Sequence, residues 1–125
     1  NVMACGLLGL GVLCIKAPVA AANLYGISID GRNKAAVAWV QVAGMRDAGL
    51  ALSTWALFAL DRPALRILVP SLLFIPIGDA WLTLSSGGTL VGASAHLLGF
   101  IAILVLAVMT WLDPTLSRRA PSSRP

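Results

Sequence analysis

Four long runs of apolar residues, separated by short polar connections, set the pattern of this sequence. A helix that crosses a membrane needs about 20 mainly apolar residues, and each run approaches that length. We expect a helix in each run, over about residues 2–24, 35–60, 64–84 and 89–112. The pattern predicts an all-α fold, an integral membrane four-helix bundle with short connections. We expect a single transmembrane domain over residues 1–116, followed by a disordered basic tail over residues 117–125.

Prolines interrupt two of the runs. Lys16-Ala17-Pro18 breaks or kinks the first helix, because proline lacks an N–H and its ring clashes with the preceding turn. We expect the chain to continue to Tyr25 as a short interfacial helix, with Tyr25 at the level of the lipid headgroups. Pro70 and Pro76 fall inside the third run, where they free backbone carbonyls that a neighbouring helix or a hydrated cavity must satisfy.

Composition supports a membrane protein. The 125 residues are 58% hydrophobic and 11% charged, with a mean hydropathy of +0.89. A soluble domain carries about 25% charged residues, so this chain has too few to cover a soluble surface. The net charge of +4 comes from residues in the connections and the tail, without a basic stripe interleaved with aromatics. We therefore expect a lipid bilayer as a partner, and no nucleic acid.

The basic residues also suggest an orientation. Two lie in the 61–66 connection and three in the tail, against three in the 16–34 connection. This balance favours a multi-pass protein with both termini in the cytoplasm, in the endoplasmic reticulum of a fungus or the plasma membrane of a bacterium. The chain starts at Asn1, and we expect a longer natural N-terminus. A signal peptide ending near Ala20-Ala21-Ala22 is the competing interpretation, but a basic leading region is lacking and three more apolar runs follow.

Charged residues inside the apolar runs are the candidate functional groups. Arg46 and Asp47 stand side by side in the middle of the second run, where a charge costs about 2.5–3.5 kcal/mol and needs a partner. Asp79 follows Pro76 by one turn, and His96, the one histidine, lies in the fourth run. A rise of about 1.5 Å per residue puts all four groups in the half of the bilayer nearest the 26–34 and 85–88 connections. We predict that they share one pocket.

We expect further residues near the mouth and walls of that pocket to contact a hydrophobic small-molecule substrate. The predicted substrate-binding residues are Asn23, Tyr25, Gln41 and Trp81. Cys5 and Cys14 are interpreted as small packing residues. With one histidine and no cysteine cluster we predict no metal site, and no cofactor-binding glycine loop occurs. Small-residue helix faces would permit close helix packing and a homo-oligomer.

Two aspartates in different surroundings suit paired acid and base catalysis. Asp79 or Asp47 would be the base, His96 or the other aspartate the acid, and Arg46 the positioning cation. Such a set fits the opening of an epoxide by water or by an internal hydroxyl. Limonene-type epoxide hydrolases use an Asp–Arg–Asp set on an unrelated fold, which is an analogy of chemistry alone.

Two other classes of function remain open. The first is a structural or accessory membrane protein, in which a buried Arg/Asp ion pair only fixes helix packing. The second is a small transporter or proton relay, which would need a polar path through the membrane. Beyond Asp47 the second run offers only Ser53 and Thr54, so this class is less favoured.

The order of short motifs resembles a family of small four-helix membrane proteins of unknown function, found in fungi and bacteria. The matching pieces are Gly6-Leu7-Leu8-Gly9, Ala17-Pro18, Tyr25-Gly26-Ile27, Gly44-Met45-Arg46-Asp47-Ala48-Gly49-Leu50-Ala51-Leu52, Gly78-Asp79-Ala80 and His96-Leu97-Leu98-Gly99. The family includes membrane epoxide hydrolases of fungal polyketide pathways, of the aurovertin type. The resemblance implies opening of epoxides on a polyene, giving hydrolysis or cyclisation, with Arg46, Asp47, Asp79 and His96 as the site residues.

Overall fold

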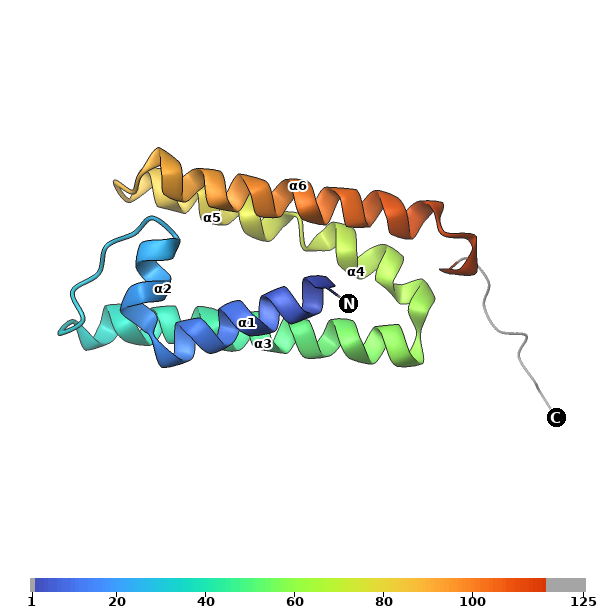
Figure 1. Cartoon of the computed structure of the whole chain (residues 1–125), viewed down its shortest axis with the longest axis horizontal. Coiled ribbons are helices and arrows are strands. Elements are labelled where there is room, and N and C mark those ends of the chain that lie inside the picture. The colour runs from blue at the N-terminus through green and yellow to red at the C-terminus, as the bar shows by residue number, and fades with distance from the viewer. Residues whose placement is uncertain (1, 117–125) are drawn as a thin grey trace.

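The computed structural model describes residues 2–116, which are helical with short connections and contain no strand (Figure 1). The α-helices are α1 (Val2–Lys16), α2 (Pro18–Leu24), α3 (Lys34–Leu60), α4 (Leu65–Ser71), α5 (Phe74–Ser85) and α6 (Leu90–Leu112), with 3-10 turns at Arg62–Ala64 and Pro114–Leu116. The all-α prediction is therefore confirmed for this part of the chain. The predicted tail at 117–125 lies outside the described residues.

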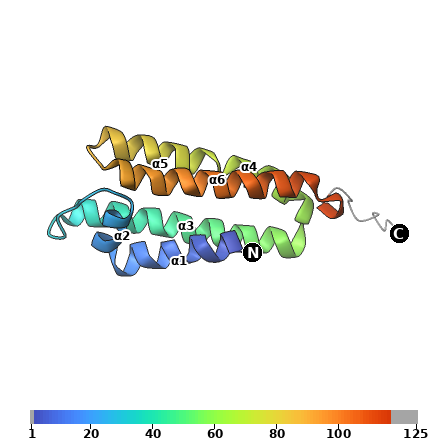
Figure 2. The same cartoon turned by 45° about the horizontal axis from the view of Figure 1, so that its top comes forward.

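The helices form two layers, which Figure 2 separates clearly. In one layer α1 lies along α3, and α2 crosses the end of this pair. In the other layer α6 lies along both α4 and α5. The candidate residues on α3 therefore face those on α5 and α6 across the space between the layers.

Small residues let α1 and α3 approach closely. A side-chain carbon added at Gly11 would lie 2.7 Å from the Gly44 carbonyl oxygen, and one added at Gly44 would lie 2.6 Å from Cβ of Cys14. Gln41 adds a polar link, since its Nε2 donates to the Ile15 carbonyl at 3.2 Å. This tight crossing fixes the position of the charged residues that follow Gly44 on α3.

The first and third apolar runs are broken at their prolines. The break after Lys16 agrees with the expected kink, and Pro18 occupies the first turn of α2, where its missing N–H costs nothing. The third run is not one helix over 64–84, as the helix boundaries predicted, but a 3-10 turn followed by α4 and α5. Neither Pro70 nor Pro76 can donate a backbone hydrogen bond, and a turn at residues 72–73 interrupts the helix between them.

Two glycines join the layers at the end where α2 lies. Gly26 has a φ of +78°, a left-handed conformation that favours glycine, and it packs directly against Gly92 on α6. The backbone N–H of Thr89 donates to the Gly26 carbonyl at 3.4 Å, and the Thr83 hydroxyl donates to the Tyr25 carbonyl at 3.4 Å. These contacts attach the segment that carries Tyr25 to the α5–α6 hairpin.

The outer faces of the second layer are apolar. Two stretches are long and apolar enough to cross a membrane, Arg62–Ser85 and Leu90–Leu112, and only 28% and 22% of their most apolar windows are buried. Large side chains such as Phe74 and Leu90 are 81% and 79% exposed. Exposed apolar surface of this extent is typical of contact with lipid, which favours membrane association.

Candidate functional site

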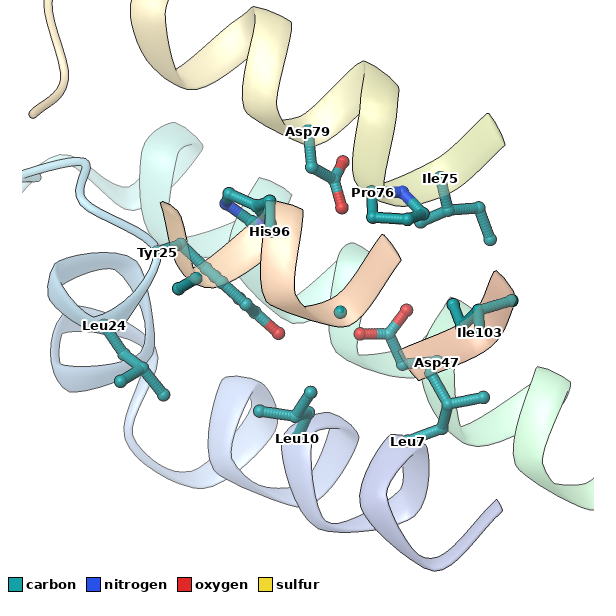
Figure 3. A pocket seen from close by; sticks show the side chains of 12 residues that line it. Leu7, Leu10, Leu24, Tyr25, Asp47, Ile75, Pro76, Asp79, His96 and Ile103 are labelled. Atoms are coloured by element: carbon teal, nitrogen blue, oxygen red, sulfur yellow. The ribbon is translucent and has the colours of Figure 1, made fainter. Parts of the chain in front are cut away.

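A cavity of about 270 Å³ lies between the two layers (Figure 3). It is lined by Leu7, Leu10, Leu24, Tyr25, Asp47, Ile75, Pro76, Asp79, Ala95, His96, Gly99 and Ile103. All helices except α4 contribute to it, so it forms only when both layers are assembled. Most of its wall is aliphatic, and its polar groups are two carboxylates, an imidazole and a phenol.

Arg46 connects the two carboxylates. Its Nε lies 3.3 Å from Oδ1 of Asp47, to which it donates a hydrogen bond, and its Nη2 lies 3.8 Å from Oδ2 of Asp79. The Asp47 side chain is 7% exposed, against 30% for Asp79 and 46% for Arg46. One guanidinium thus links α3 to α5 and balances one of two negative charges when both aspartates are ionised.

Tyr25 and His96 form the other polar wall. Their rings stack with centroids 5.3 Å apart and an angle of 21° between the planes. The Cys14 thiol lies 3.8 Å from the Tyr25 hydroxyl and donates to it. His96 is 9% exposed, and its Nε2 is buried without a hydrogen-bond partner in the described part of the chain. An unpaired buried polar atom costs about 1–3 kcal/mol, so this nitrogen is available to a ligand.

A second, smaller cavity adjoins the first. Its volume is about 130 Å³, and Tyr25, Asp79 and His96 line both cavities. Its remaining wall comes from α3, the end of α5 and the loop after Tyr25, through Ala43, Thr83 and Ile27 among others. Asp79 and His96 can therefore be reached from two sides, while Asp47 borders only the larger of the two cavities.

The structure brings together the four residues that the sequence selected as catalytic candidates. Asp47, Asp79 and His96 line the larger cavity, and Arg46 lies behind the two carboxylates. Arg46 and Asp47 come from α3, and Asp79 and His96 come from the α5–α6 hairpin further along the chain. Their chemical roles remain predictions.

Of the four expected substrate contacts, only Tyr25 lines the cavities. Trp81 is 71% exposed, because it lies two residues from Asp79 and about 200° around the same helix. Asn23 is exposed, with the same two-residue offset from Tyr25. Gln41 donates a hydrogen bond to the Ile15 carbonyl on α1. These three residues lie outside both cavities.

The sequence interpretation did not select the apolar wall of the site. Leu7 and Leu10 belong to it and lie three residues apart on α1, and on α6 Gly99 and Ile103 follow His96 at intervals of three and four. Residues at these intervals share one helix face. On α6 that spacing, counted from the histidine, is the signal that would have identified Gly99 and Ile103.

The described residues contain no group of three or more His, Cys, Asp or Glu side chains that could hold a metal ion. A larger cavity of about 370 Å³ lies elsewhere in the molecule, between Met3, Phe58, Leu65 and Leu106 among others. Asp113 is the one acidic residue among those that line it, and none of its lining residues is basic or a histidine.

Comparison with protein families gave one match. The pattern of the family described as "Domain of unknown function (DUF4267)" matches residues 4–112, and the chain belongs to this family. The matched range includes every residue of the candidate site. Comparisons with curated proteins and with solved structures gave no match.

Proposed function

We propose that this member of the DUF4267 family is a multi-pass membrane enzyme that opens an epoxide on a hydrophobic, polyketide-like or polyene-like substrate by acid–base catalysis. The observation that carries the proposal is the Asp47–Arg46–Asp79 set beside His96 on one mostly aliphatic cavity. Charged groups inside apolar helices are expensive, and a shared reaction explains why three helices contribute them to one place.

The reaction would proceed in one displacement. Asp79 accepts a proton from a water molecule, whose oxygen attacks one carbon of the epoxide ring. The carbon–oxygen bond breaks, its electron pair moves to the ring oxygen, and that oxygen receives a proton from His96 or from Asp47. The product is a vicinal diol. If a hydroxyl of the substrate replaces water, the same steps give a cyclic ether with a new hydroxyl group.

Asp79 is the preferred base because of where it lies. It borders both cavities, and the smaller one has a volume of about 130 Å³, enough for water molecules of about 30 Å³ each. Asp47 is closer to Arg46, which suits it to hold the guanidinium. It is also more deeply buried, which suits the alternative role of the acid. Arg46 contacts both carboxylates and would keep them at a constant separation during the reaction.

The cavity suits part of a larger apolar substrate. Pockets that enclose a drug-sized ligand measure about 300–1,000 Å³, and this one is slightly smaller, at about 270 Å³. It would accommodate the epoxide and a few neighbouring carbons, while the remainder of the substrate extends into the lipid.

The test is an assay of the reconstituted protein with a long-chain epoxide, in water enriched in ¹⁸O. We expect a diol carrying one labelled oxygen, detected by mass spectrometry. Asp79→Asn should lower turnover by about 10²-fold or more, the range of general acid–base catalysis. Asp61→Asn, at the end of α3 and away from the cavities, is the matched control and should retain activity. Undiminished turnover in both Asp79→Asn and Asp47→Asn would exclude the proposed roles.

The second candidate is a non-catalytic structural protein, favoured by the position of Arg46 as a link between α3 and α5. In that case apolar replacement of the whole charged set would preserve biological function and change stability only modestly. The enzyme proposal requires the opposite result for function.

A further inference from the structure

His96 Nε2 is the one buried side-chain nitrogen or oxygen without a hydrogen-bond partner in residues 2–116. Buried polar atoms in folded proteins are almost always paired with protein, water or a ligand. Tyr25 covers one face of the imidazole ring, with the ring centroids 5.3 Å apart, and both cavities border the histidine. The free nitrogen is therefore held in a defined place at the edge of space that a ligand can occupy.

The chemistry of this nitrogen limits its partner. A neutral imidazole presents one donor and one acceptor nitrogen. If Nε2 carries the hydrogen, it would donate to an ether or epoxide oxygen, and if it does not, it would accept a hydrogen bond from a hydroxyl. In either case the natural partner is an oxygen of the ligand.

The fixed charges at the site argue against an anionic ligand. Two carboxylates share the single guanidinium of Arg46. Because this guanidinium already contacts Asp47 and Asp79, no unpaired cation of the described residues remains at the site for an anionic ligand. The remaining wall is aliphatic and offers nothing to stabilise a second charge.

The aliphatic wall shows where the rest of the ligand can lie. Leu7 and Leu10 on α1 face Gly99 and Ile103 on α6 across the cavity, as Figure 3 shows for the three residues with labelled side chains. A side-chain carbon added at Gly99 would meet no atom within 4 Å, so the space above this glycine is open. Direct contact between α1 and α6 is slight compared with that of α1 with α3. The cavity thus has an apolar side between α1 and α6.

We infer that this site binds a long-chain molecule without an anionic group, with an ether, epoxide or hydroxyl oxygen at His96 Nε2 and a hydrocarbon chain that passes between α1 and α6 over Gly99. The inference rests on the proposed function and deepens it, because it names the ligand class, the group that receives its oxygen and its route from the lipid. Gly99 is then the residue that determines how bulky a chain can enter.

His96 allows a direct test because it is the single histidine of the chain. Protein labelled with ¹⁵N-histidine in lipid nanodiscs gives one pair of imidazole signals. The probes are 1-methoxydecane, which is an unreactive ether, dodecane, which has a similar length but no oxygen, and undecanoate, which is charged. We expect 1-methoxydecane to shift the Nε2 signal saturably, dodecane to leave it unchanged, and undecanoate to bind about tenfold more weakly or not at all.

Variants test the route of the chain. Gly99→Leu fills the open space and should weaken binding of 1-methoxydecane by about tenfold or more. Gly49→Leu is the matched control, since the space at Gly49 is also open but lies outside both cavities, and it should bind as the parent does. If Gly99→Leu does not fold, Ala95→Leu narrows the same cavity from the same helix.

An equal response to dodecane, tighter binding of undecanoate, or unchanged binding in both cavity variants would overturn the inference. These results are independent of turnover, because the ether does not react. Binding of the ether without any opening of epoxides would reject the proposed function and leave the inference intact. Epoxide turnover with an unresponsive His96 would reject the inference alone.

Discussion

Arg46 determines the electrostatic balance of the site, because it is the cation that contacts both Asp47 and Asp79. Asp47 is the most buried of the three, and its remaining contacts are mainly aliphatic. Removing the guanidinium would leave an uncompensated charge inside an apolar molecule. Removing all three charged groups would leave no uncompensated charge there.

We therefore expect Arg46→Met to lower the free energy of unfolding by about 1–3 kcal/mol, because it leaves the buried Asp47 carboxylate without its partner, while the half-exposed Arg46 is already partly screened. The triple variant Arg46→Met, Asp47→Leu, Asp79→Leu should recover most of this loss, to within about 1 kcal/mol of the parent. Reversible unfolding in mixed detergent micelles measures both values. An Arg46→Met variant as stable as the parent would mean that the ion pairs do not contribute to the stability of the fold.

At the scale of the element, α1 and α3 depend on two glycines at their crossing. Gly44 has no room for a side chain, whereas Gly49, on the same helix, faces open space. A glycine-to-alanine change in a helix interior otherwise favours the helix by about 0.5–1 kcal/mol.

Gly44→Ala should therefore destabilise the protein by about 1–3 kcal/mol through overpacking, while Gly49→Ala should be neutral or slightly stabilising. The midpoint of thermal unfolding, followed by circular dichroism, separates the two variants. Equal midpoints would contradict the tight α1–α3 crossing.

Polar contacts satisfy the backbone carbonyls at the end of α6. Arg66 donates to the carbonyls of Thr110, Trp111 and Asp113 at 2.7–3.1 Å, which satisfies the free carbonyls of the last turn. Asp113 accepts hydrogen bonds from the hydroxyl and the backbone N–H of Thr115, and these bonds lower the pKa of its carboxyl from the ordinary 3.8.

Because this pKa is lower in the folded state, the stabilisation by Asp113 is present above pH 3.8 and is lost as pH falls through the lowered value. Thr115→Val removes the hydroxyl bond and should raise the pKa of Asp113 towards 3.8. Titration of the carboxyl carbon signal of Asp113 by NMR in the parent and the variant measures the change. An unchanged midpoint would show that the hydroxyl bond does not form in solution.

At the scale of the whole molecule, the arrangement predicts a topology. The 26–33 loop and the 86–89 turn lie at the same end of the two layers, and the 61–64 connection lies at the other end (Figure 1). If both layers span the membrane, these ends face opposite compartments.

Single cysteines introduced at Ser28 and Ser86, in a background where Cys5 and Cys14 are replaced, should react with an impermeant maleimide from the same side. A cysteine at Asp61 should react only from the opposite side, which the basic residues predict to be the cytoplasm. Labelling of all three positions from one side would exclude a multi-pass arrangement.

The sequence alone determined that the apolar runs are helical and where the charged groups lie along them. Apolar runs of this length satisfy their backbone only as helices, prolines limit where helices continue, and the rise per residue converts position into depth. For this reason Arg46, Asp47, Asp79 and His96 could be selected as a group. The break after Lys16 was also predicted, whereas the run over residues 64–84 was predicted as one helix and is divided into α4 and α5.

Only the tertiary structure decided which side of each helix faces the site. These helices are apolar on nearly all sides, so their hydrophobic pattern does not indicate an inner face. Trp81 and Asn23 therefore appeared as plausible as Tyr25, until the packing of the segment after α2 against α6 placed Tyr25 against His96. The open space over Gly99 and the unpaired Nε2 of His96 likewise depend on contacts between layers, which local sequence does not encode.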